Sequence, residues 1–199
     1  AAQISILKNN GDGTWGADVI ASDGNTGHLE LVNSDGSTEH ISSSGVNIYN
    51  LYDLEISDVD NNGYQDLLIF NSEAIFVLEN YGSDADWDYS LIANRLSNSD
   101  QSYFVLPDGS TQDLPFNTIG LSNISVGDLD GDALDDIVLF SGANPNEAAQ
   151  ISILKNNGDG TWDADIVAAD GNSGHLELVN SDGSTELISS SGVSIYNLY

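Results

Sequence analysis

The chain has 199 residues, of which 40% are hydrophobic, so it is long and apolar enough to bury a core. Its formal net charge is -29, with 32 acidic residues against three basic ones. A surface of that sign repels phosphate groups, so nucleic acid and anionic membranes are excluded as expected partners. The absence of cysteine excludes disulfides, thiolate metal sites and cysteine nucleophiles.

No apolar run approaches the roughly 20 residues of a membrane span, so we expect no membrane insertion. The first residues also lack a basic segment followed by an apolar one, so we expect that any export signal has already been removed. The acidic surface suits a saline, calcium-containing medium. The expected location is therefore extracellular, either secreted or at a cell surface.

An internal repeat organises the chain. Residues 1–52 recur as residues 148–199, and the two copies differ at only seven of the 52 positions. A weaker repeat relates residues 58–70 to residues 128–140. The offset of 147 between the near-identical copies is twice a module of about 73 residues, so the basic repeating unit is expected to have that length.

Short apolar runs rich in β-branched and aromatic residues predict strands in each module. They are residues 67–70, 75–78, 103–106, 137–140, 151–154 and 176–179. Dipeptides that accept the positive φ angles of tight hairpins lie between the predicted strands. They are Asn10-Gly11, Asp35-Gly36, Asp108-Gly109, Asn157-Gly158 and Asp182-Gly183.

These features predict an all-β fold made of antiparallel hairpins. Four or more strands that recur about every 73 residues favour β-propeller blades over a solenoid. We expect an incomplete blade at residues 1–57 and two blades at residues 58–127 and 128–199. A closed propeller typically needs four to eight blades. Either the polypeptide is longer or several copies assemble.

Two acidic loops stand immediately before predicted strands. In residues 58–66, oxygen-bearing side chains occupy positions 1, 3, 5 and 9, with Gly63 at position 6. Alternate side chains of a curled loop converge on one centre, and the backbone carbonyl at position 7 can join them. Calcium prefers such an all-oxygen set, whereas zinc and copper prefer nitrogen or sulfur. The predicted ligands are Asp58, Asp60, Asn62, Asp66 and the carbonyl of Tyr64.

The second loop, residues 128–136, has the same spacing, but Ala133 replaces the expected glycine. Its predicted calcium ligands are Asp128, Asp130, Asp132, Asp136 and the carbonyl of Leu134. Neither loop matches an EF-hand, because position 12 is Ile69 or Leu139 instead of glutamate.

The loop pattern, together with the Asn-Asn-Gly-Asp-Gly-Thr-Trp segments at residues 9–15 and 156–162, resembles FG-GAP or VCBS repeats. That resemblance implies blades of an integrin-α-like propeller whose loops bind calcium. It also implies an adhesive or ligand-binding module, with glycans or cell-surface proteins as partners. Two alternatives remain open: the propeller portion of a secreted polysaccharide-degrading enzyme, and a structural repeat that self-associates into fibres.

The remaining candidates for chemistry do not indicate an enzyme. His28, His40 and His175 are the only histidines, and His40 is leucine in the other copy of the repeat. We expect them at the surface or in packing. Trp15, Trp87 and Trp162 follow equivalent turns, where they either pack between neighbouring blades or stack on a sugar ring.

Overall fold

The computed structural model describes most of the chain. The described residues are 3–23, 29–41, 51–71, 74–82, 87–95, 102–116, 121–141, 149–170 and 176–188. They form sixteen β-strands in three sheets and no helix. The predicted all-β fold is therefore confirmed, and within these residues no closed barrel or propeller is formed.

The first sheet has four strands in the order β1-β2-β3-β4. They are β1 (Gln3–Asn9), β2 (Trp15–Asp23), β3 (Leu29–Val32) and β4 (Thr38–His40). The other two sheets have six strands each, again paired in chain order.

The second sheet contains β5 (Leu51–Ser57), β6 (Asp66–Asn71), β7 (Ala74–Glu79), β8 (Asp88–Arg95), β9 (Ser102–Val105) and β10 (Thr111–Asp113). The third contains β11 (Leu121–Gly127), β12 (Asp136–Ser141), β13 (Gln150–Asn156), β14 (Trp162–Asp170), β15 (Leu176–Val179) and β16 (Thr185–Leu187). Each of the six strand predictions coincides with one of these strands. The expected blade boundaries after Ser57 and Gly127 fall within these sheets, between their first and second strands.

Every sheet is an antiparallel meander, as the turn dipeptides predicted. The glycine of each predicted dipeptide has a positive φ, between 72° at Gly158 and 81° at Gly36. Glycine adopts this conformation without the steric cost that a Cβ atom imposes. The chain can therefore reverse within a few residues and pair consecutive strands.

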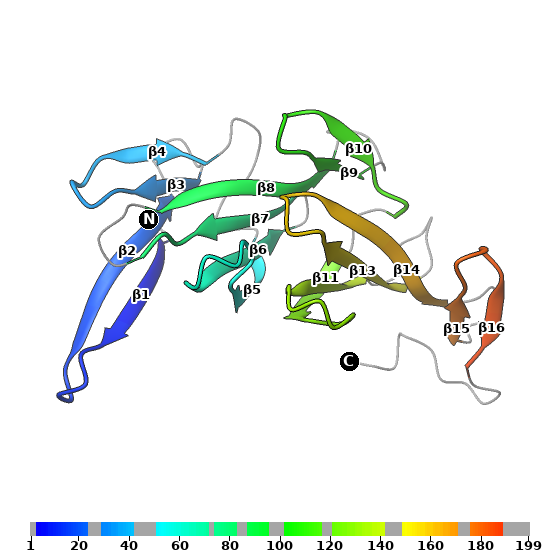
Figure 1. The fold of residues 1–199 in the computed structure, drawn as a ribbon. Helices are drawn as coiled ribbons and strands as arrows, with labels where there is room; N and C mark the ends of the chain where they lie inside the picture. The colour runs from blue at the N-terminus through cyan, green and yellow to red at the C-terminus, as the bar shows by residue number, and fades with distance from the viewer. Residues whose placement is uncertain are drawn as a thin grey trace.

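The second sheet lies between the other two, and both of its faces are buried (Figure 1). Alternate residues of β6 point to opposite faces. Leu67 and Ile69 belong to the apolar cluster shared with the first sheet, whereas Leu68 and Phe70 belong to the cluster shared with the third. This explains why β6 is apolar at consecutive positions instead of alternating with polar residues.

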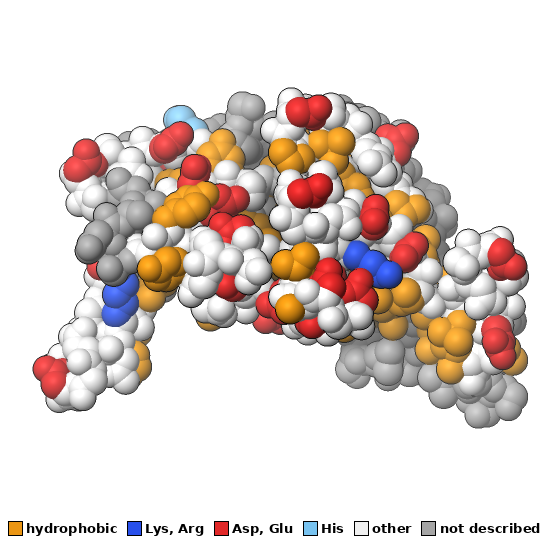
Figure 2. All heavy atoms as spheres, viewed as in Figure 1, with side chains coloured by type: hydrophobic (Ala, Val, Ile, Leu, Met, Phe, Trp, Pro, Cys, Tyr) orange, Lys and Arg blue, Asp and Glu red, His pale blue; other side chains and the backbone are white. Residues whose placement is uncertain are grey.

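The surface of this layered structure is strongly acidic. Figure 2 shows Asp and Glu side chains in many separate places on the visible face and only two small areas of Lys or Arg. Within the described residues no helix is long and apolar enough to cross a membrane.

Candidate metal centre

The first acidic loop connects β5 to β6 and brings three carboxylates together. Asp58, Asp60 and Asp66 each offer an oxygen, and these oxygens lie within 4.8 Å of one another. Asp66 is the first residue of β6, so the sheet holds one side of the triad while the loop supplies the other two carboxylates. The arrangement could hold a metal ion.

Hydrogen bonds to Asp58 shape this loop. Its Oδ1 accepts the backbone N–H of Asn62 at 2.9 Å, and its Oδ2 accepts the N–H of Gly63 at 2.9 Å. The chain curls around this carboxylate by using positive φ angles of 57° at Asn61 and 90° at Gly63. Asn and Gly are the residues that tolerate this region best. The sequence therefore encodes the curl locally.

Asp66 is a buried carboxylate without a basic partner. Its side chain accepts the N–H of Asn80 at 2.8 Å and the N–H of Val59 at 2.9 Å. Burial raises the pKa of Asp66 above its ordinary value, although these two hydrogen bonds oppose the shift. Among the described side chains, no lysine or arginine forms an ion pair with it. A cation in the triad would supply the missing positive charge.

The second loop repeats this geometry between β11 and β12. Asp128, Asp130 and Asp136 offer oxygens within 4.8 Å of one another. Asp136 is buried at the start of β12 and accepts the N–H of Leu129 and of Asn156, each at 3.0 Å. The two loops thus share the same triad and the same pair of backbone donors to the buried aspartate.

Ala133 occupies the position of Gly63 and has the same left-handed backbone, with a φ of 73°. An L-residue with a Cβ atom is strained there by about 1 to 2 kcal/mol. The second loop therefore keeps the curl of the first loop even though alanine replaces the expected glycine.

We expect Ala133→Gly to raise the free energy of unfolding by about 0.5 to 1 kcal/mol, since relief of strain exceeds the entropy of the freer unfolded chain. Gly63→Ala is the reciprocal change and should lower it by about 1 kcal/mol. Nothing lies within 4 Å of a Cβ atom added at Gly63, so the effect isolates backbone strain from steric overlap. Urea denaturation of both variants in chelator measures the difference. If both substitutions changed the free energy of unfolding in the same direction, backbone strain at this loop position would be contradicted.

Positions 5 and 7 of the loops lie outside the two triads. The Oδ1 atoms of Asn62 and Asp132 accept the N–H of Tyr64 and Leu134, respectively, each at 2.8 Å. Metal coordination by these four residues stays a prediction.

The side chains at position 7 have a packing role. A Cβ atom placed on Gly82 would come 3.0 Å from the ring of Tyr64, and one placed on Gly158 would come 2.9 Å from Leu134. Each side chain therefore covers the glycine of the next hairpin turn.

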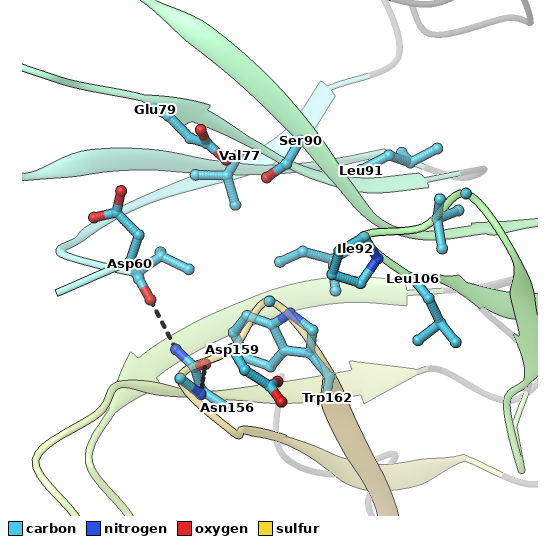
Figure 3. A pocket seen from close by; sticks show the side chains of 16 residues that line it. Asp60, Val77, Glu79, Ser90, Leu91, Ile92, Leu106, Asn156, Asp159 and Trp162 are labelled. Carbon is cyan, nitrogen blue, oxygen red and sulfur yellow. Dashed lines mark hydrogen bonds between the residues drawn. The ribbon is translucent and has the colours of Figure 1, made fainter. Parts of the chain in front are cut away.

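The two loops are connected across the boundary between the second and third sheets. Ser57 Oγ donates a hydrogen bond of 2.6 Å to Asp135, and Asn156 Nδ2 donates one of 2.8 Å to the carbonyl of Val59. Figure 3 shows Asn156 beside the loop that carries Asp60. Asn156 and its counterpart Asn80 were not predicted from the sequence as part of the site. Both stand in Asn-x-Gly turns, a pattern that also occurs at Asn9.

Side chains from the two sheets also line a cavity of about 520 Å³ at this boundary. Trp162 and Ile92 lie on opposite sides of it (Figure 3). Trp162 is buried in the apolar cluster, which supports packing between sheets for this tryptophan. Trp87 packs against the other apolar cluster, whereas Trp15 is exposed.

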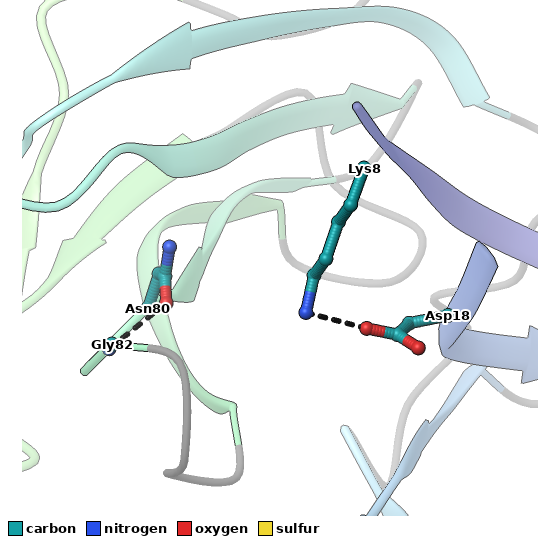
Figure 4. Close-up of polar contacts among 4 residues, drawn as sticks. All are labelled: Lys8, Asp18, Asn80 and Gly82. Carbon is teal, nitrogen blue, oxygen red and sulfur yellow. Dashed lines mark hydrogen bonds and ion pairs between the residues drawn. The ribbon is translucent and has the colours of Figure 1, made fainter. Parts of the chain in front are cut away.

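A comparable cavity of about 690 Å³ lies between the first and second sheets. Figure 4 shows its polar side, where Lys8 forms an ion pair of 2.5 Å with Asp18 and Gly82 donates its N–H to Asn80. Of the three histidines, the structure describes His40. His40 is exposed with Glu30 at 3.5 Å, and His28 and His175 lie outside the described residues.

The hairpin turns contain a second class of aspartate, which is exposed and bonded to a hydroxyl two residues later. Asp159 Oδ1 accepts the Thr161 hydroxyl at 2.5 Å and its N–H at 3.0 Å. These two bonds lower the pKa of Asp159 below its usual 3.8. Because the folded pKa is the lower one, the stabilisation is present above pH 3.8 and is lost as the pH falls through the folded pKa.

We expect Thr161→Val to raise the pKa of Asp159, since the hydroxyl makes the larger contribution. Carboxyl carbon shifts followed by NMR from pH 6 to about 2 would measure it. Asp12, which is bonded to Thr14 in the same manner, is the internal control and should titrate as before. If the pKa of Asp159 did not change in the Thr161→Val chain, the hydroxyl of Thr161 would not be the main cause of the lowered pKa.

Comparison of the chain with protein-family models, with curated proteins and with solved structures finds no match. The two acidic triads and the repeat that carries them are therefore the features of this chain that indicate a function.

Proposed function

We propose that the two acidic loops bind calcium and that the chain is an extracellular β-repeat module for adhesion or for binding a glycan or protein ligand. The observation that carries this proposal is the recurrence of one triad, with one pair of backbone donors, in two successive sheets. Solvated acidic turns need no such repetition, and nothing else among the described side chains balances the buried charge of Asp66.

The donor set favours calcium over other metals. Every predicted ligand atom is an oxygen, and calcium takes six to eight oxygens in flexible loops. Zinc prefers nitrogen and sulfur, and magnesium demands a stricter octahedral geometry. A bound calcium ion would supply positive charge, and the loop residues would orient their carboxylates toward it while Asp66 and Asp136 keep their backbone hydrogen bonds.

A binding role is proposed in preference to catalysis because the closely spaced carboxylates belong to the two proposed metal loops. The FG-GAP or VCBS assignment and the blade arrangement belong to the same proposal. They are supported by the loop motif, the meander of six strands and the stacking of successive sheets. The acidic surface, with a net charge of -29, suits a saline medium that contains divalent cations.

Isothermal titration calorimetry on the chelator-treated 199-residue chain tests the proposal. We expect about two calcium ions per chain, weaker binding of magnesium, and a rise in the melting temperature with calcium concentration. Zinc should not compete at equal concentration. Absence of saturable calcium binding, or loss of binding at a physiological salt concentration, would refute the metal role and the function built on it.

A further inference from the structure

Two hydrogen bonds cross from the first acidic loop to residues beside the second. Asn156 Nδ2 donates one of 2.8 Å to the carbonyl of Val59, which lies 97 positions earlier in the chain (Figure 3). Ser57 Oγ donates the other, of 2.6 Å, to Asp135, which lies 78 positions later. Ser57 stands directly before the first predicted ligand of its loop, and Asp135 stands directly before the last predicted ligand of the other. The first loop is thus tied to the second at two points.

The bond made by Asn156 belongs to a continuous chain of hydrogen bonds between the two buried aspartates. Val59 donates its N–H to Asp66 at 2.9 Å and accepts the side chain of Asn156 with its carbonyl. The backbone N–H of Asn156 then donates to Asp136 at 3.0 Å. Only two residues therefore separate the buried carboxylate of one triad from the buried carboxylate of the other.

The side chain of Asn156 is held in one orientation. Its Oδ1 accepts the N–H of Gly158 at 2.9 Å, so its Nδ2, the donor end of the amide, is directed to Val59. Asn156 is 5% exposed and Ser57 is 1% exposed, so water has little access to replace either bond. A buried polar group that loses its partner is costly. Neither loop can therefore move away from the other without that cost.

This connection has a consequence for metal binding. An ion holds a loop in one arrangement, because several oxygens must converge on it. Binding that orders a segment lowers the ordering cost of a second binding event that needs the same segment. Since the two loops share hydrogen bonds, ordering the first loop also orders part of the second.

We propose that Asn156 and Ser57 are positioning residues that link the two acidic loops, so that calcium in the first loop raises the affinity of the second loop for calcium. By thermodynamic reciprocity, calcium in the second loop raises the affinity of the first by the same factor. The inference rests on the proposed function, since it requires calcium binding by both loops. It adds that the two sites fill cooperatively and that their ions stabilise the boundary between the second and third sheets.

A calcium titration of the isotope-labelled 199-residue chain, followed by NMR, measures each loop separately. The amide of Gly63 donates to Asp58 in the first loop, and the amide of Ala133 donates to Asp128 in the second. We expect Asp60→Asn, which weakens the first site, to lower the affinity of the second loop about fivefold or more. A physiological salt concentration limits the direct effect of one ion's charge on the other loop, because distant charges are screened.

Removing both connections should abolish this dependence. In a chain carrying Ser57→Ala and Asn156→Ala, Asp60→Asn should change the affinity of the second loop less than about twofold. Ser57→Ala alone should reduce the dependence, and it is used if the double variant does not fold. These alanine substitutions change no charge, so electrostatic effects between the loops are the same with and without them. A merely structural role would lower the melting temperature and leave the dependence intact.

Asn9→Ala is the matched control. Asn9 accepts the same turn hydrogen bond as Asn156, also at 2.9 Å, and among the described residues it forms no bond to either acidic loop. In chelator, Asn156→Ala should speed hydrogen exchange of the Val59 amide about threefold or more, because it frees that residue from the third sheet. Asn9→Ala should leave the exchange rate of Val59 unchanged.

The outcomes separate this inference from the proposed function. Calcium binding in both loops with no effect of Asp60→Asn on the second loop would overturn the inference alone. So would a dependence that survives loss of both connections, or an unchanged exchange rate of Val59 in the Asn156→Ala chain. Absence of saturable calcium binding would refute the proposed function, and the linkage of affinities with it.

Discussion

Trp162→Ala is expected to lower the free energy of unfolding by about 3 to 5 kcal/mol, the cost of removing a large aromatic side chain from a packed core. Trp162 is 6% exposed and belongs to the cluster between the second and third sheets. No nearby backbone can collapse fully into the space, because both sheets are held by their own strand ladders. Urea denaturation in chelator, followed by far-ultraviolet circular dichroism, measures the loss.

The chain contains its own control for this experiment. Trp15 occupies the same place in the same sequence but is 62% exposed, so Trp15→Ala should change the free energy of unfolding by no more than about 0.5 kcal/mol. The two substitutions remove the same atoms at the start of equivalent strands. A similar loss for both would show that their environments are alike and would contradict the assignment of Trp162 to the core.

Asp130→Ala is expected to remove most of the stabilisation that calcium gives to the second loop. At a hundredfold excess of ion over the dissociation constant, that stabilisation is about 2.7 kcal/mol. Within the described residues Asp130 accepts no hydrogen bond, so its carboxylate has no structural role beyond the triad. The melting temperature should therefore fall relative to the unmodified chain in calcium and stay nearly unchanged in chelator.

Asp128→Ala should behave differently, and the contrast sharpens the test. Asp128 accepts the N–H of Gly131 at 2.7 Å and of Ala133 at 3.1 Å, so its loss leaves two loop donors without their acceptor. We expect destabilisation by about 1 to 3 kcal/mol even in chelator, with a further loss in calcium. Equal losses for Asp130→Ala in calcium and in chelator would contradict a metal role for the triad.

The sequence predicted the local features of the molecule well. Turn glycines and apolar runs encode their conformation within a few residues, so the strands and hairpins could be assigned from the chain alone. The spacing of Asp58, Asp60 and Asp66 likewise encodes a curl that brings the carboxylates together. Asn80 and Asn156 were missed, because their contact with the buried aspartates crosses from one hairpin to the next and leaves no spacing rule.

Composition, the internal repeat and the grouping of the acidic triads were thus determined by the sequence itself. The tertiary structure alone showed that Leu154 packs in the apolar cluster between the second and third sheets, whereas Leu7 in the identical strand β1 is exposed. Leu7 and Leu154 have the same neighbours in sequence but opposite exposure, since burial depends on which sheet packs against them. Packing partners are distant along the chain, and a local pattern repeated twice cannot distinguish them.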